Sequence, residues 1–148
     1  MKIDNTGRDF IYKHEGVRLK AYLDVAGIPT IGVGFTYMPG GKKVALGDKI
    51  TLAQCDSLFT TIVADFEAAV NKMVKVSLTQ NQFNALVSFS FNVGTSALAQ
   101  STLLKRVNAN ASPEQIKAAF AMWVKAGGKV IPDLVKRRND EANLYFTT

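Results

Sequence analysis

The sequence has little of the residue types that build metal centres or covalent cross-links. Its 148 residues include one cysteine, Cys55, and one histidine, His14. A single cysteine excludes an intrachain disulfide, so stability must come from packing, and synthesis in a reducing compartment is expected. These two residues cannot supply a zinc ligand set, and the acidic residues lack the spacing of a calcium-binding loop. We therefore predict no metal site and no cofactor.

Long apolar runs are also absent. The N-terminal residues 1–10 contain no apolar stretch of signal-peptide length, and no segment approaches the roughly 20 apolar residues that span a bilayer. We expect synthesis in a cytoplasm without a signal peptide, and no stable membrane insertion. Gly32 and Gly34 do not form a dinucleotide-binding fingerprint, because a third glycine is missing and the pair lies inside a predicted hairpin.

What is present is an ordinary globular composition with an excess of positive charge. Hydrophobic residues make up 47% of the chain and charged residues 20%. These proportions exclude a disordered or fibrous protein. The formal net charge of +6 favours an anionic partner, which could be nucleic acid, a membrane surface or an acidic polysaccharide. Charge alone does not choose among the three.

A short helix is predicted near the N-terminus, ending at about Glu15. Thr6 followed by Asp9 resembles a capping box, and apolar residues follow a helical period from there. Gly16 can adopt the left-handed conformation that commonly ends a helix. Glu15 then lies in the last turn, where the helix dipole, together with partial burial, would favour the protonated carboxyl. Taken alone, a glutamate here is more often an ordinary surface residue.

A β-hairpin is predicted directly after this helix. Residues 17–23 alternate between apolar and polar, as in a half-buried strand, and residues 28–34 form the return strand. Asp24 ends the first strand and Thr30 lies in the second. If the loop has an odd number of residues, such as 26–28, Asp24 and Thr30 lie opposite one another on one face. Singly, an aspartate at a turn and a strand threonine are usually structural.

The combination of these residues is more specific than any one of them. The relevant positions are Glu15, Gly16, Leu19, Ala21, Tyr22, Asp24, Gly27, Thr30, Ile31, Gly32, Gly34 and Thr36. In this order and spacing they closely resemble the signature of the bacteriophage-type lysozymes, or endolysins, of glycoside hydrolase family 24. Residues 78–94, 101–104 and 132–141 resemble later segments of the same family. The resemblance covers essentially the whole chain.

The resemblance implies a lysozyme-like α+β fold. A small N-terminal lobe would hold the β-hairpin sheet, and a long helix would join it to a larger helical C-terminal lobe. We expect one catalytic domain over residues 1–148, with a soft lobe boundary near residue 50. Helical periods and capping residues agree with this fold; they predict helices after Thr51, over 79–91 as a buried hub, within 97–109, from Ser112 through Trp123, and from Pro132.

The resemblance also implies catalytic roles for Glu15, Asp24 and Thr30. Glu15 would be the general acid that protonates the leaving glycosidic oxygen, while Asp24 and Thr30 would position the attacking water, giving inversion. A carboxyl separation of about 6.5–9.5 Å would suit inversion, and about 5–5.5 Å a retaining nucleophile. An arginine of the last helix, Arg137 or Arg138, would contact Glu15. The sequence does not distinguish the two, and a solvated basic face is an equal alternative.

Other residues are candidates for substrate binding or for support of the acid. They are Gly34, Phe35 and Trp123, and a core position is the more common role for such a tryptophan. Many relatives have histidine where this chain has Phe35, so Phe35 is expected to pack. Asp133 stands where relatives often have glycine. His14 neighbours Glu15, but consecutive helical residues do not face each other, which favours a structural role; Cys55 is expected in the core.

Together these expectations describe an endolysin muramidase, which hydrolyses the β-1,4 bond between N-acetylmuramic acid and N-acetylglucosamine in peptidoglycan. It would be made in the host cytoplasm, reach the periplasmic wall through a separate holin, and act as a monomer. A phage-tail or bacteriocin context is an alternative setting. Two alternatives belong to other classes: an inactive peptidoglycan-binding module, which would lack the acid, and a basic nucleic-acid-binding domain, for which no recognised motif is present.

Overall fold

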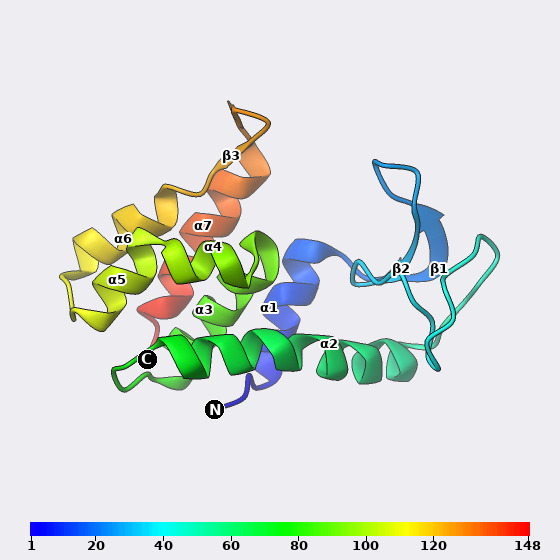
Figure 1. Cartoon of the computed structure of the whole chain (residues 1–148), viewed down its shortest axis with the longest axis horizontal. Coiled ribbons are helices and arrows are strands. Elements are labelled where there is room, and N and C mark those ends of the chain that lie inside the picture. The colour runs from blue at the N-terminus through cyan, green and yellow to red at the C-terminus, as the bar shows by residue number, and fades with distance from the viewer. The chain divides into compact units, whose positions relative to one another are not determined.

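The computed structural model describes all residues 1–148, which form two compact units. The hairpin unit is Asp9–Val63, and the helical unit comprises Met1–Arg8 and Ala64–Thr148. Helix α1 (Asn5–Glu15) and helix α2 (Leu52–Met73) contribute residues to both. Seven helices and two short antiparallel strand pairs make up the chain (Figure 1), in agreement with the predicted α+β class. The chain divides after Arg8 and Val63, whereas the sequence placed a soft boundary near residue 50.

The two ends of α1 are set by short-range hydrogen bonds. At its start, the Asp4 carboxylate accepts from the Gly7 N–H at 3.1 Å, so Asp4 caps the helix and the predicted cap at Thr6 is wrong. At its end, the Gly16 N–H donates to the Tyr12 carbonyl at 2.8 Å, and Gly16 has φ +80°. That left-handed conformation confirms the predicted helix end at Glu15.

The sheet of the hairpin unit pairs β1 (Arg18–Leu23) with β2 (Pro29–Gly32). β2 is shorter than the predicted strand 28–34, because the chain reverses immediately after it. Ile31 and Phe35 exchange N–H to carbonyl bonds, both at 2.8 Å, across a turn in which Gly32 and Gly34 have positive φ. On the other edge, the Ile50 N–H donates to the Leu19 carbonyl at 2.9 Å, an extension of the sheet that the sequence did not predict.

Buried side chains from the hairpin, the following loop and α2 form the core of this unit. They include Ile11, Ile31, Val33, Phe35, Val44, Ile50, Cys55, Phe59 and Val63. Cys55 is fully buried, as predicted. Thr51 and Gln54 exchange capping bonds at the start of α2, which confirms the predicted cap. The Gly- and Lys-rich segment 38–43 is an exposed loop apart from half-buried Met38.

The helical unit is built around α3 (Gln80–Val93). Every residue of α3 from 83 to 90 is buried, which confirms the predicted hub. α3 packs against α7 (Pro132–Tyr145) and α4 (Thr95–Gln100); α5 (Thr102–Asn108) packs against α4 and α6 (Pro113–Ala121), and α6 also packs on α7. Residues 1–8 belong here because the Ile3 N–H donates to Glu67 at 2.8 Å and Asn84 donates to Asp4 at 2.8 Å.

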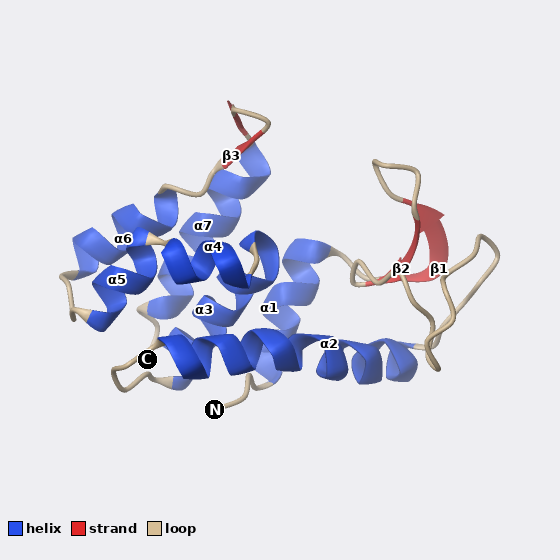
Figure 2. Ribbon diagram, viewed as in Figure 1, coloured by secondary structure: helices blue, strands red, loops and turns tan.

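The segment around Gly127 and Gly128 differs from the prediction. It is not a simple helix stop after Trp123: α6 ends at Ala121, and β3 (Lys125–Ala126) pairs with β4 (Lys129–Val130), the second strand pair coloured red in Figure 2. The two glycines have φ +59° and +78°. Two successive positive φ values are those of the tight turn that suits a two-residue hairpin loop. No helix of the chain is long and apolar enough to cross a bilayer.

Candidate active site

Glu15 is the last residue of α1 and is exposed. The expectation of partial burial is therefore wrong. Its position in the last helical turn is as predicted, so the negative end of the α1 dipole acts on its carboxyl group. The next residue, Gly16, starts the connection to β1, so Glu15 stands directly before the hairpin that carries the other two predicted catalytic residues.

Asp24 organises the turn between β1 and β2. Its Oδ1 accepts hydrogen bonds from the N–H groups of Ala26, at 2.9 Å, and Ile28, at 2.8 Å. Its own N–H donates to the Ile28 carbonyl at 3.0 Å, so three residues, 25–27, form the loop. One carboxylate oxygen thus holds the turn, and Oδ2 is left to accept from a bound molecule. The structure thus shows a structural role for Asp24, and its catalytic role stays a prediction.

Thr30 is buried, with 3% of its surface exposed, and its hydroxyl donates to the Ile28 carbonyl at 2.8 Å. The loop has an odd number of residues, as the prediction required, but the predicted register is wrong by two positions. Tyr22, not Asp24, lies opposite Thr30. Because residues two apart along a strand project to the same side, Asp24 and Thr30 still share a face, diagonally across the hairpin.

Tyr22 lies between these two residues on the same face of the hairpin. The Arg18 guanidinium stacks over the Tyr22 ring, 4.2 Å from its centroid. Both side chains come from β1, and the pairing of β1 with β2 is irregular between them. The face that carries Asp24 and Thr30 therefore also carries an aromatic ring and a positive charge.

The remaining candidates of the hairpin unit have structural positions, either in side-chain packing or in a backbone turn. Phe35 is 3% exposed and packs against Gly32, which agrees with the expectation that it packs in place of a polar ring. Gly34 is exposed, with φ +76°, and allows the reversal after β2. His14 packs against Phe10 with the two rings tilted, 4.7 Å between ring centroids, and is half-buried.

Arg137 and Arg138 lie on α7 in the helical unit and both bind Glu141. Arg138 Nη1 is 2.8 Å from one carboxylate oxygen, and Arg137 Nε is 3.3 Å from the other. The Ser88 hydroxyl of α3 donates to the same carboxylate at 2.6 Å. All four side chains are buried, so the alternative of a solvated basic face is wrong for both arginines. A contact with Glu15 stays a prediction.

Glu141 is a fully buried carboxylate for which the sequence predicted no role. Burial raises the pKa of its carboxyl, against the lowering effect of Arg138, Arg137 and the Ser88 hydroxyl. The spacing of the two arginines and Glu141, three and four residues apart, was a usable signal, because such positions share a helix face. Trp123 is half-buried and packs edge-on against Phe89, 5.8 Å between centroids; substrate stacking by Trp123 stays a prediction.

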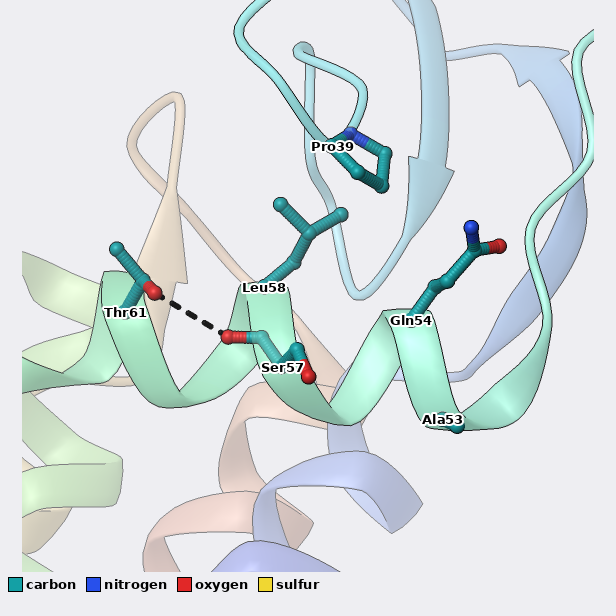
Figure 3. A pocket seen from close by; sticks show the side chains of 6 residues that line it. All are labelled: Pro39, Ala53, Gln54, Ser57, Leu58 and Thr61. Carbon is teal, nitrogen blue, oxygen red and sulfur yellow. Dashed lines mark hydrogen bonds between the residues drawn. The ribbon is translucent and has the colours of Figure 1, made fainter.

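A separate pocket of about 310 Å³ lies between α2 and the 38–43 loop within the hairpin unit. Pro39 lines it from the 38–43 loop, and Leu58 projects toward that proline from α2 (Figure 3). The remaining lining residues, Ala53, Gln54, Ser57 and Thr61, also come from α2. None of the candidate catalytic residues contributes to this pocket.

Comparison with known proteins places this geometry in a family. The family model described as "Phage lysozyme" matches residues 12–141. The endolysin of Salmonella phage P22 is 41% identical over 148 residues, which cover 99% of each chain. The endolysin of Acyrthosiphon pisum secondary endosymbiont phage 1 is 39% identical, over 98% of each chain.

Solved structures agree with the sequence comparison. A mutant of P22 lysozyme matches with a TM-score of 0.91 and 40% identity, covering 99% of each chain. The muramidase domain of SpmX from Asticaccaulis excentricus matches with a TM-score of 0.85 and 33% identity, also over 99% of each chain. The fold is therefore lysozyme-like, and the chain belongs to the phage lysozyme family.

Proposed function

We propose that this chain is an endolysin muramidase that hydrolyses the β-1,4 bond between N-acetylmuramic acid and N-acetylglucosamine in peptidoglycan. Glu15 protonates the leaving glycosidic oxygen, and Asp24 and Thr30 hold the attacking water. The membership of the phage lysozyme family supports the reaction. The hydrogen bonds of the β1–β2 hairpin support the roles of the residues.

The observation that carries the proposal is that Ile28 forms one hydrogen bond with each of the two water-holding groups, the Asp24 carboxylate and the Thr30 hydroxyl. Its carbonyl takes the Thr30 hydroxyl proton, so the Thr30 oxygen can only accept a further hydrogen bond. Its N–H donates to Asp24 Oδ1, which leaves Oδ2 as an acceptor. A water held by both groups donates both hydrogens to them. Its lone pairs are then directed away, toward an anomeric carbon.

Glu15 supplies the complementary half of the chemistry. A general acid must hold a proton when the sugar binds, and Glu15 is proposed for this role because it ends α1 directly before the hairpin that carries Asp24 and Thr30. Asp24 is held in place by the two backbone N–H groups that donate to its Oδ1. A proton donor and a water-holding acceptor on opposite sides of a sugar form the arrangement of an inverting glycosidase.

The products test this proposal. Purified peptidoglycan is digested, the new reducing ends are reduced with borohydride, and the reduced sugar is identified by mass spectrometry. The proposal predicts reduced N-acetylmuramic acid; reduced N-acetylglucosamine would contradict it. Proton NMR of the first product formed from a β-linked oligosaccharide should show the α anomer. Initial formation of the β anomer would show retention and exclude the proposed role of Asp24 and Thr30.

We further infer that one of the two α7 arginines supports Glu15. Because both arginines also bind Glu141, loss of stability alone cannot identify the one that does. A double-mutant cycle that combines Glu15→Gln with Arg137→Gln or Arg138→Gln separates the effects. The supporting arginine should show a coupling of about 0.5 kcal/mol or more with Glu15, and the other arginine none. No coupling for either would contradict the inference.

The partners follow from the same reading. Endolysins act on the cell wall, and we propose that this chain acts as a monomer and reaches the wall only when a separate holin permeabilises the membrane. Light scattering of the purified protein should give the mass of one chain. Expression in bacteria should lyse the cells only when a holin is co-expressed; lysis by this chain alone would contradict the second statement.

A further inference from the structure

The C-terminal turn of α1, which carries Glu15, is tied to α2 through Tyr12. The Tyr12 hydroxyl donates to Asp56 Oδ1 at 2.6 Å, and its ring meets Phe59 edge-on at 5.0 Å between centroids. The Cys55 thiol is a further hydrogen-bond partner of the phenol. One stretch of α2, residues 55–59, therefore holds the Tyr12 side chain by hydrogen bonds and a ring contact.

Tyr12 also belongs to the turn that ends at Glu15. Its carbonyl accepts the Gly16 N–H at 2.8 Å, the bond that closes the last turn of α1. A movement of Tyr12 therefore moves the backbone that carries Glu15. Burial, followed by the hydrogen bond to Asp56, raises the pKa of the Tyr12 phenol, so the phenol keeps the proton that it donates.

The same stretch of α2 supports the catalytic hairpin. Cys55 packs beneath the end of β2, where a Cβ on Gly32 would lie 3.4 Å from its sulfur. Gly32 is two residues after Thr30 and ends β2. Ile28, directly before β2, is bound by Asp24. The acid-bearing turn and the water-holding hairpin thus rest on adjacent residues, Cys55 and Asp56, of one helix.

We propose that Tyr12 and Asp56 are positioning residues, which set the place of Glu15 relative to Asp24 and Thr30. This inference rests on the proposed function. The hydrogen bond acts on Glu15 through the turn of α1, without touching the substrate. Its loss should therefore slow the chemical step and leave substrate binding unchanged, since misplacement of a reacting group lowers the rate more than the affinity.

The test compares kcat and KM on a soluble peptidoglycan fragment, at a temperature well below the unfolding of every variant. Tyr12→Phe, which keeps the ring and loses the donor, and Asp56→Ala should each lower kcat by about tenfold with KM unchanged. The double variant should be no slower than either single one. Asp56→Asn keeps an acceptor and should restore most of the rate. Tyr37→Phe and Asp65→Ala, at exposed positions, are matched controls.

The outcomes separate this inference from the proposed function. Wild-type kcat in folded Tyr12→Phe, additive losses in the double variant, or a rise in KM at unchanged kcat would each overturn the positioning role. If Glu15→Gln is inactive while Tyr12→Phe is fully active, the inference alone fails. If the unchanged chain releases no reducing ends, the proposed function fails and this inference fails with it.

Discussion

The Thr30 hydroxyl has a fixed direction. It donates to the Ile28 carbonyl from a side chain that is 3% exposed, and rotation to another direction would lose this bond. Thr30→Val preserves the shape and removes the oxygen. It should lower kcat by about 100-fold with little change in KM, because water is no longer oriented. Thr147→Val is the control, since Thr147 also donates to a backbone carbonyl, at 2.7 Å. Equal activity of the two variants would contradict this role.

Gly32 is a second residue on which the hairpin depends. It has φ +67°, and a Cβ there would lie 2.5 Å from the Phe35 ring. Gly32→Ala therefore adds a steric clash to backbone strain, and the free energy of unfolding should fall by about 2–4 kcal/mol in urea titrations. Gly40→Ala, with φ +92° and open space around it, measures the strain alone and should lose about 1 kcal/mol. Equal losses of unfolding free energy in the two variants would mean that the Phe35 ring moves aside and that no clash remains.

At the scale of elements, α7 is held to α3 by a buried ionic cluster, defined as Arg137, Arg138, Glu141 and Ser88. Glu141→Ala removes the acceptor shared by the other three. Because breaking a buried pair leaves uncompensated charge, the free energy of unfolding should fall by about 3–5 kcal/mol. Lys136→Gln, which breaks the exposed pair with Asp140, should change it by less than about 1 kcal/mol. Similar losses would show that the cluster adds little.

Elements whose ends are set locally were predictable. Gly16, Thr51 and Thr79 bond within a few residues of themselves, so the sequence alone indicated where α1 ends and where α2 and α3 begin. Ser112 followed by proline indicated α6 in the same way. The cap of α1 was misplaced because Asp4 and Thr6 are both acceptable caps; Asp4 also binds Asn84, eighty residues away, which favours it.

The errors have a common cause, since each depends on contacts between distant residues or on a turn type. The register of the hairpin follows from a loop that closes through Asp24 and Ile28, so Tyr22 takes the place opposite Thr30. The only sequence signal for Glu141 is its spacing from two arginines. Its buried hydrogen bond comes from Ser88, 53 residues away. The Tyr12 bond to Asp56 spans 44 residues and has no local signature. Residue types alone could nominate the candidate catalytic residues, but they could not give the hydrogen bonds and the register that position them.

At the scale of the whole molecule, the raised pKa values of Tyr12, Tyr145 and Cys55 make the free energy of unfolding depend on pH in alkali. Burial raises the pKa of Tyr12 and Tyr145 above 10.0 and that of Cys55 above 9.0. The folded chain keeps the protons of these groups where the unfolded chain loses them. The free energy of unfolding should therefore be unaffected by these groups below about pH 9 and should fall as pH rises above it.

Urea titrations from about pH 8 to about pH 11 measure this loss. In Tyr145→Phe the fall with pH should be shallower than in the unchanged chain, because one proton no longer contributes. Tyr37→Phe, at an exposed position, should leave the fall as it is. A free energy of unfolding that rises above pH 9, or an equal slope in the Tyr145 variant, would contradict the assignment.

The account as a whole depends on Glu15, which is tested by the release of reducing ends from purified peptidoglycan. The unchanged chain should release them, and Glu15→Gln should be slower by about 10²–10⁴-fold. Its stability should be equal or slightly higher, because a charge at the negative end of α1 is removed. Glu114→Gln, exposed in the first turn of α6, should retain full activity. Equal release by the unchanged chain and Glu15→Gln would contradict the central claim that Glu15 is the general acid.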